Sequence, residues 1–198
     1  MEIILATRNP SKALQTQAVF SGSDIQVRTL DDAGIEGEAA EDGTTLEENS
    51  SKKAWYAHER SSDTWTMADD TGIFIAALNG EPGIHAASWA GNVSTEEITA
   101  YCLKRLKGVV DRSAVFRTVV LLISPAGEKH VFTGEVSGTV LEAPRVPPQP
   151  KMPYSPIFVP DGQNLCWAEM SIEYENTISQ RGIAFRKART FLESIAKL

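Results

Sequence analysis

Short apolar runs alternate with amphipathic, charged segments along the chain, and this alternation predicts an α/β protein with a mixed sheet. Strands are expected at residues 2–6, 65–68, 73–78, 114–124, 131–136 and 138–141. Helices are expected at residues 11–20, 44–60 and 95–106, and a last helical pattern in 178–198 begins near Arg181. Because residues 114–124 form the most β-branched run of the chain, they predict a central strand.

Three features mark the ends and interruptions of these elements. Asn9 and Pro10 fit the N-cap and first turn of the first helix, and Ser94 with Glu97 forms a capping box for the third. Residues 69–72 interrupt two apolar runs, and residues 81–83 are typical of a turn. Residues 144–156 hold six of the ten prolines, which predicts an irregular loop of the kind that is usually functional or disordered.

Composition narrows the class of protein. The chain has 198 residues with 19 Lys and Arg against 26 Asp and Glu, a formal charge of −7, which argues against binding duplex nucleic acid or an anionic membrane surface. No apolar run approaches the roughly 20 residues of a membrane span, and the first residues do not resemble a signal peptide. Cys102 and Cys166 are expected to be reduced thiols. We therefore expect a cytoplasmic protein with one two-lobed domain over residues 1–198.

The turn before the first helix is a candidate phosphate site. A helix N-terminus presents unpaired N–H groups and the positive end of the helix dipole, which suit an anion. Thr7 and Asn9 add side-chain donors, and Lys12 adds a full positive charge. An ordinary capped turn is the alternative interpretation.

A second candidate site combines acidic residues with the helix over residues 44–60. Asn49 and Lys53 are four residues apart and share one face of this helix, whereas Lys52 and Lys53 cannot both point inward. Asp69 and Asp70 lie between apolar runs, where carboxylates are costly unless positive charge accompanies them. With Glu41 they would form the hard oxygen cluster that Mg²⁺ binds together with substrate phosphates. A solvent-exposed turn remains the alternative.

Taken in order, several segments resemble the inosine triphosphate pyrophosphatase family. They are LATRNPSK at the start, GTTLEENSSKKA with Glu41 just before it, MADDTGIFIAALNGEPGIHAASWAG in the middle, and PYSPIFVP, AEMS and ISQRGIAF near the end. The resemblance implies an elongated mixed β-sheet with flanking helices, two lobes around a central cleft, and a homodimer. It also implies hydrolysis of a nucleoside triphosphate to a monophosphate and pyrophosphate, with Mg²⁺ as cofactor or Mn²⁺ in its place.

The same resemblance implies roles for the matching polar residues. Thr7, Asn9 and Lys12 look like the phosphate-binding loop of the family, and Lys53 looks like its second phosphate lysine. Thr71 is expected at the end of a strand that faces the cleft and the substrate.

The acidic residues match the metal and water-activating positions of the family. Glu41, Asp69 and Asp70 are the implied metal ligands, and Asp70 is also the implied general base. With Lys12 and Lys53, Asp70 completes the expected catalytic set.

The chain departs from the family where the nucleobase is expected to bind. Lys151 to Pro156 replace a Gly-Phe-Gly-Tyr/Trp-Asp-Pro motif, so that methionine stands for the phenylalanine and serine for the aspartate. A glutamate replaces a lysine ahead of a Ser-His-Arg motif that reads Ser-Gln-Arg in this chain. The residues expected to contact the base are Met152, Tyr154, Ser155, Glu175, Ser179, Gln180 and Arg181.

These departures predict an altered base preference, because an ionised glutamate accepts hydrogen bonds that a lysine would donate. Such a change disfavours a 6-keto base and favours an N–H or exocyclic amine. Glu175 could instead point to solvent, with the usual inosine and xanthosine triphosphate preference retained. A nucleotide-binding protein without turnover is the third alternative.

Overall fold

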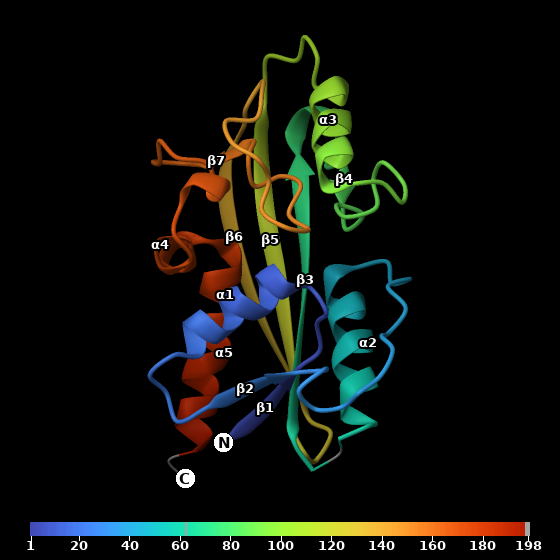
Figure 1. Ribbon diagram of the computed structural model, residues 1–198, viewed down its shortest axis with the longest axis vertical. Helices are drawn as coiled ribbons and strands as arrows, with labels where there is room; N and C mark the ends of the chain where they lie inside the picture. Colours follow the sequence, from blue (N-terminus) through green and yellow to red (C-terminus); the bar gives the residue numbers. More distant parts are fainter. Residues whose placement is uncertain (62, 197–198) are drawn as a thin grey trace.

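A computed structural model describes residues 1–61 and 63–196, and a mixed β-sheet runs through its length (Figure 1). The strands are β1 (Glu2–Leu5), β2 (Gln26–Thr29), β3 (Trp65–Ile75), β4 (Pro82–Gly83), β5 (Ser113–Ile123), β6 (Lys129–Val140) and β7 (Phe158–Pro160). Their order is β2-β1-β3-β5-β6-β7, and β4 pairs with β3 beside this path. β1 pairs in parallel with β2 and β3, and the remaining pairs are antiparallel.

Helices cover both faces of the sheet. They are α1 (Pro10–Phe20), α2 (Leu46–His58), α3 (Thr95–Arg105), α4 (Ile172–Ile178) and α5 (Gln180–Ile195), with short 3₁₀ turns η1 (Ala76–Leu78) and η2 (Trp167–Glu169). In Figure 1, α1 and α5 lie on one side of the lower sheet and α2 lies on the other. None of the helices among residues 1–61 and 63–196 is long and apolar enough to cross a membrane.

Alternation along the strands divides the core into three clusters. Ile3 and Leu5 of β1 pack with Phe185 of α5, whereas Ile4 between them packs with Ala54 of α2 on the opposite face. The third cluster lies at the other end of the long strands, where α3, the proline-rich loop and η2 meet β3 and β5. The long strands β3, β5 and β6 thus connect two packed ends of the molecule (Figure 1).

Several predicted elements are confirmed. α1 begins at Pro10 with Asn9 as its N-cap, and α3 begins after Ser94 with the expected capping box. β5 lies between β3 and β6, as a central strand should, and residues 144–156 contain no helix or extended strand. The α/β fold with a mixed sheet and flanking helices is the predicted one.

Other boundaries differ from the prediction. β3 is one strand that passes through residues 69–72 without a turn, and β6 joins the two short strands expected at residues 131–141. The sequence pattern did not reveal β2, β7 or α4. α5 begins at Gln180 and ends at Ile195, and the last two residues of the predicted helical segment, 197 and 198, lie outside the described residues.

Candidate functional site

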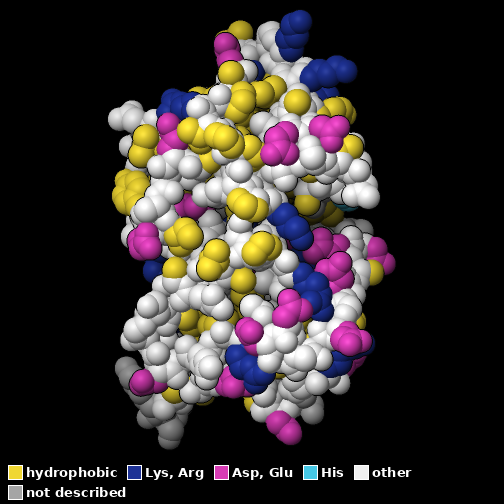
Figure 2. All heavy atoms as spheres, in the orientation of Figure 1, with side chains coloured by type: hydrophobic (Ala, Val, Ile, Leu, Met, Phe, Trp, Pro, Cys, Tyr) yellow, Lys and Arg dark blue, Asp and Glu magenta, His cyan; other side chains and the backbone are white. Residues whose placement is uncertain are grey.

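A cavity opens where the first turn of α1, the middle of β3, residues 38–41 and the proline-rich loop meet. On the face shown in Figure 2, basic and acidic side chains lie next to one another near the middle of the molecule. The predicted site residues that line this cavity are Thr7, Asn9, Lys12, Glu41, Lys53, Asp70, Thr71, Met152, Tyr154, Ser155, Glu175, Gln180 and Arg181. Asp69 and Ser179 lie behind this lining.

The turn from β1 into α1 is built by its own side chains. Asn9 Oδ1 accepts hydrogen bonds from the backbone N–H groups of Ser11, at 3.0 Å, and Lys12, at 3.4 Å. Thr7 Oγ1 accepts one from the N–H of Asn9 at 3.2 Å. The cap fixes the direction of α1 and so places Lys12 at the cavity, which means that Asn9 also acts as a structural residue.

Asp69 and Asp70 face opposite sides of the sheet, because neighbouring strand residues alternate. On one side, the Lys12 Nζ lies 3.0 Å from Asp69 Oδ2, and the Arg181 Nε donates to the same oxygen at 3.5 Å. On the other side, the Lys53 Nζ donates to Asp70 Oδ1 at 3.0 Å. Each buried carboxylate therefore has its own cationic partner, and the alternative of a solvent-exposed turn is excluded.

The charges around Asp69 shift its titration. Burial alone would raise the pKa of its carboxyl, but Lys12, Arg181 and Lys53 outweigh that effect and hold the pKa well below its usual range. Burial lowers the pKa of Lys12, and the nearby Asp69 opposes this shift. Asp69 Oδ1 is buried and has no hydrogen-bond partner among the described residues. One acceptor oxygen at the site is thus left without a donor.

Asp70 is oriented from α2. Asn49 donates from Nδ2 to Asp70 Oδ2 at 3.2 Å and accepts at Oδ1 from the N–H of Gly43 at 2.8 Å. The Lys53 Nζ lies 3.1 Å from Glu41 Oε1 as well as contacting Asp70. Burial would lower the pKa of Lys53, but the carboxylates of Asp70, Asp69 and Glu41 outweigh it and raise the pKa. As expected for neighbouring helix positions, Lys53 points inward while Lys52 pairs with the exposed Asp42.

The three expected metal ligands do not form a single cluster. Lys53 stands between Glu41 and Asp70, and Asp69 lies on the other face of β3 with Lys12. Among residues 1–61 and 63–196, no group of three or more acidic, histidine or cysteine side chains is arranged to hold a metal ion. Two of the three expected ligands, Glu41 and Asp70, line the cavity, and two carboxylates are a number that Mg²⁺ commonly takes when substrate phosphates supply other ligands.

Glu175 also lines the cavity and is only 4% exposed. Gln15 donates from Nε2 to Glu175 Oε1 at 2.7 Å, and Gln149 donates from Nε2 to Oε2 at 3.4 Å. Burial raises the pKa of the Glu175 carboxyl. The alternative that this side chain points to solvent is therefore wrong. Arg181 also donates to Gln15 Oε1, so a buried network connects Glu175 with Asp69.

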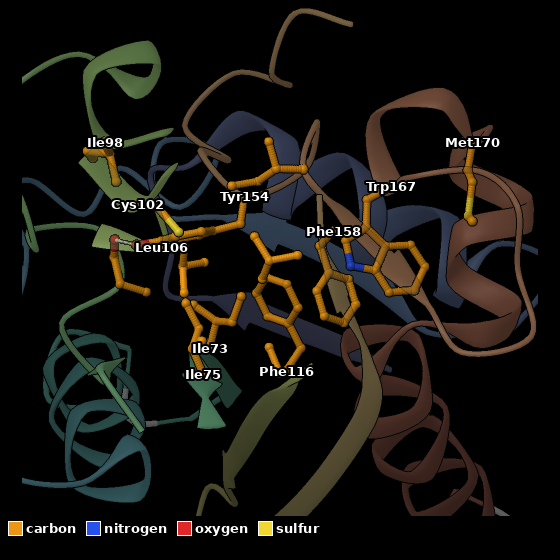
Figure 3. Packing of buried hydrophobic residues seen from close by; sticks show 14 residues of the cluster. Ile73, Ile75, Ile98, Cys102, Leu106, Phe116, Tyr154, Phe158, Trp167 and Met170 are labelled. Atoms are coloured by element: carbon orange, nitrogen blue, oxygen red, sulfur yellow. Dashed lines mark hydrogen bonds between the residues drawn. The ribbon is translucent and has the colours of Figure 1, made fainter. Parts of the chain in front are cut away.

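Several predicted base contacts also have structural tasks. Tyr154 donates its hydroxyl to the Ala86 carbonyl at 2.9 Å, and burial raises the pKa of that hydroxyl. Its ring lies beside Phe116 in the cluster of Figure 3. Ser155 Oγ accepts from the Gln149 N–H and donates to the Met152 carbonyl.

The Ser-Gln-Arg segment is divided between the core and the cavity. Ser179 is buried and caps α5 by accepting from the N–H of Gly182 at 3.1 Å. The Ser179 side chain therefore stabilises the start of α5, and it does not line the cavity. Gln180 and Arg181 line the cavity, and Gln180 Oε1 is buried without a partner among the described residues.

The residues that shape this cavity without having been predicted as site residues include Gln15, Gln149, Lys151 and Trp167. Gln15 lies three positions after Lys12, which places both residues on one face of α1. This spacing could have predicted Gln15 as a site residue. Gln149 and Lys151 belong to the proline-rich loop, whose path no periodicity reveals. Trp167 lies in a 3₁₀ turn too short for a recognisable pattern.

Comparisons with known proteins show which family the chain belongs to. The sequence profile of the Ham1 family matches residues 3–191. The dITP/XTP pyrophosphatase of Caldanaerobacter subterraneus is 35% identical over 97% of this chain and 96% of its own length. That of Leuconostoc mesenteroides is 36% identical over 94% of each chain.

Solved structures of Ham1 proteins have the same fold as this chain. The Ham1 protein of Staphylococcus aureus superposes with a TM-score of 0.82 at 32% identity, covering 98% of this chain and 99% of that one. A HAM1 protein from Coxiella burnetii reaches a TM-score of 0.85 at 30% identity, with the same coverage. The predicted resemblance to a nucleoside triphosphate pyrophosphatase family is thus confirmed. The chain belongs to the Ham1 family.

Proposed function

We propose that this chain hydrolyses a nucleoside triphosphate to a monophosphate and pyrophosphate, with a base preference other than inosine or xanthosine. The observation that carries the proposal is the pairing of Lys12 with Asp69 and of Lys53 with Asp70 beside one cavity. A protein that only binds nucleotides needs the lysines, but it does not need a second carboxylate, Asp70, oriented on the cavity lining. We further propose that residues 1–198 act as one two-lobed domain.

The phosphates would bind between α1 and α2. Lys12 and Lys53 line the cavity from opposite faces of β3, so a polyphosphate between them meets two full charges. The hydroxyl groups of Thr7 and Thr71 and the amide of Asn9 lie on the same lining. Charge neutralisation and alignment account for most of the rate in phosphoryl chemistry.

The donor set fits a hard divalent cation, Mg²⁺ or Mn²⁺. Glu41 and Asp70, which both line the cavity, would hold it on the α2 side. Asp69 lies behind this lining on the other face of β3 and would act on the ion only through its charge. When bound, such an ion neutralises phosphate charge and orients the reacting group. Carboxylate oxygens, with no thiolate or imidazole among them, favour these metals over zinc.

Asp70 is the proposed general base. A water molecule attacks the α-phosphorus, the bond to the bridging oxygen of pyrophosphate breaks, and a carboxylate oxygen of Asp70 takes the proton of the water. Asn49 and Lys53 hold this carboxylate in one orientation. A base so positioned contributes typically about 10²- to 10⁴-fold to the rate.

The base preference follows from Glu175. Its carboxylate is buried and held by two amide groups, so in its ionised form it offers acceptors to the nucleobase and no donor. A keto oxygen facing Glu175 is also an acceptor, so neither group would receive a hydrogen bond from the other. An exocyclic amine, in contrast, would donate to the carboxylate. The resemblance places Met152 where the family has a phenylalanine, and loss of that ring would remove a stacking contribution of roughly 1 kcal/mol.

The test is the rate of pyrophosphate release from inosine, xanthosine, adenosine, guanosine and pyrimidine triphosphates. We expect inosine triphosphate to be a poor substrate relative to the best one. The double variant Glu175→Lys with Gln180→His should move kcat/KM toward inosine triphosphate by roughly ten- to hundredfold, because a donor replaces a buried acceptor. Glu173→Lys with Gln180→His is the matched control, since Glu173 is exposed on the same helix.

Two outcomes would contradict this proposal in different ways. Strong preference of the unmodified protein for inosine or xanthosine triphosphate would show that the pocket retains the preference named in its relatives. Tight nucleotide binding with no pyrophosphate release from any triphosphate would favour a non-catalytic nucleotide-binding protein. We also propose a homodimer, which light scattering in solution would test by its mass.

A further inference from the structure

The tip of the proline-rich loop carries a lysine in a backbone conformation that suits glycine. Lys151 has φ of 57°, in the left-handed region, and it lines the cavity. The Met152 N–H donates to the Gln149 carbonyl at 3.0 Å and closes a four-residue turn with Pro150 second and Lys151 third. A type II turn favours proline at its second position and needs positive φ at its third, where glycine is preferred. A lysine at this position costs folding free energy that glycine would not.

The turn is fixed against the proposed phosphate end of the cavity. Ser11 donates its hydroxyl to the Pro150 carbonyl at 2.9 Å, which joins the turn to the first turn of α1, next to Lys12. Ser155 Oγ bonds both the Gln149 N–H and the Met152 carbonyl and holds the turn from the other side. The backbone at Lys151 is therefore held beside the first turn of α1, and its exposed side chain lines the cavity.

Lys151 differs from the other cations of this lining. Arg8, Lys12, Lys53 and Arg181 each form an ion pair with a carboxylate. Within residues 1–61 and 63–196, Lys151 forms neither an ion pair nor a side-chain hydrogen bond. Its positive charge is thus available to an anion in the cavity without displacing a protein partner.

We propose that Lys151 is a substrate-binding residue that contacts the polyphosphate of the nucleotide, a third lysine beside Lys12 and Lys53. The strained turn, its attachment to α1 and the unpaired charge carry this inference together. It rests on the proposed function for the identity of the substrate. Lys151 binds from the loop side, whereas Lys12 and Lys53 bind from helices α1 and α2.

The test separates binding from folding by comparing Lys151→Gly with the wild type. Calorimetric titration with inorganic tripolyphosphate in Mg²⁺ buffer should show binding about tenfold weaker in the variant, with a smaller dependence on salt. The midpoint of thermal unfolding should be unchanged or higher, because glycine relieves the turn. A purely structural lysine would not move the two readouts in these opposite directions.

Two controls define the role of the charge. Lys151→Arg keeps a cation at the turn and should bind tripolyphosphate nearly as the wild type does. Lys107→Asn removes an equal charge from an exposed turn after α3 and should leave both readouts unchanged. Unchanged affinity in Lys151→Gly, a lower unfolding midpoint, or no tripolyphosphate binding by the wild type would overturn the inference.

Failure of the proposed function would look different. If the wild type binds tripolyphosphate through Lys151 but hydrolyses no triphosphate, the phosphate contact stands and the catalytic proposal falls. If it hydrolyses triphosphates and Lys151→Gly binds tripolyphosphate equally well, only the assignment of Lys151 falls. Weakened binding of nucleotides with unchanged binding of tripolyphosphate would place Lys151 on the base or sugar and would also overturn it.

Discussion

At the scale of single residues, two adjacent aspartates have different surroundings because a strand sends neighbours to opposite faces. Asp69 is locked by Lys12 and Arg181, whereas Asp70 shares Lys53 with Glu41 and lines the cavity. We propose that Asp69 organises charge while Asp70 accepts the proton of the attacking water. The different surroundings of the two aspartates follow from the alternation of side chains along β3.

The ion pairs of Asp69 predict a specific pH dependence of stability. A carboxyl whose pKa is lowered by folding stabilises the protein above its unfolded pKa, near 3.8, and this stabilisation is lost as the pH falls further. Asp69→Asn should therefore lower the free energy of unfolding at pH 7 by about 3–5 kcal/mol, since it leaves buried cations unpaired. The gap to the wild type should narrow below about pH 4.

Urea denaturation of both proteins between pH 3 and pH 7 measures this gap. Asp42→Asn is the control, because Asp42 is an exposed acid that also pairs with a lysine, and it should unfold much as the wild type does. A gap between wild type and Asp69→Asn that stays constant over the whole pH range would show that the Asp69 ion pairs are not its source.

At the scale of elements, the start of α5 lies in direct contact with the sheet. A Cβ added at Gly134 of β6 would come within 2.0 Å of the Gln180 carbonyl and 2.9 Å of the Ala184 nitrogen. Only a glycine permits this approach, which places Gln180 and Arg181 at the cavity. The packing of one strand and one helix thus sets the position of two site residues.

Gly134→Ala should therefore affect both stability and activity. Because the new methyl group meets backbone atoms, α5 must shift, and overpacking of this kind costs typically about 1–3 kcal/mol. The same shift should withdraw Arg181 from Asp69 and lower kcat/KM. Ser137→Ala, on an exposed position of the same strand, should change neither. Wild-type stability and activity in Gly134→Ala would contradict the close packing.

The sequence revealed most elements but not the continuity of β3. Two aspartates within an apolar run suggest an interruption of the strand. They can be buried in β3 because lysine and arginine side chains pair with them. Arg181 is 112 residues from Asp69, so no local pattern could show the pairing. β2 and β7 were missed because four and three residues carry too little periodicity.

The sequence predicted only part of the candidate site, again because local patterns do not show contacts between distant segments. Motif residues such as Lys12, Lys53 and Asp70 lie on regular elements whose faces the sequence predicts, and the structure brings them to one cavity. Gln149 and Lys151 belong to a loop whose path depends on Ser11 and Ser155 contacts. Those contacts exist only in the folded chain.

At the scale of the whole molecule, the cavity lies at the middle of the long strand β3, between the two packed ends of the sheet. β1, α1 and α2 bring the proposed phosphate-binding groups, and the proline-rich loop with α4 and the start of α5 brings the proposed base-binding groups. We propose that the base-binding groups of this chain differ from those of its family while the phosphate-binding groups are retained.

The most direct test of the central claim is phosphorus NMR of the products formed from the best triphosphate of the panel. With Mg²⁺ the wild type should release one monophosphate and one pyrophosphate per turnover, and excess chelator should stop the reaction until Mg²⁺ is restored. Asp70→Asn should release neither product while binding the nucleotide within a few-fold of the wild type. A nucleoside diphosphate and orthophosphate as products, full activity in chelator, or near-normal hydrolysis by Asp70→Asn would contradict the account.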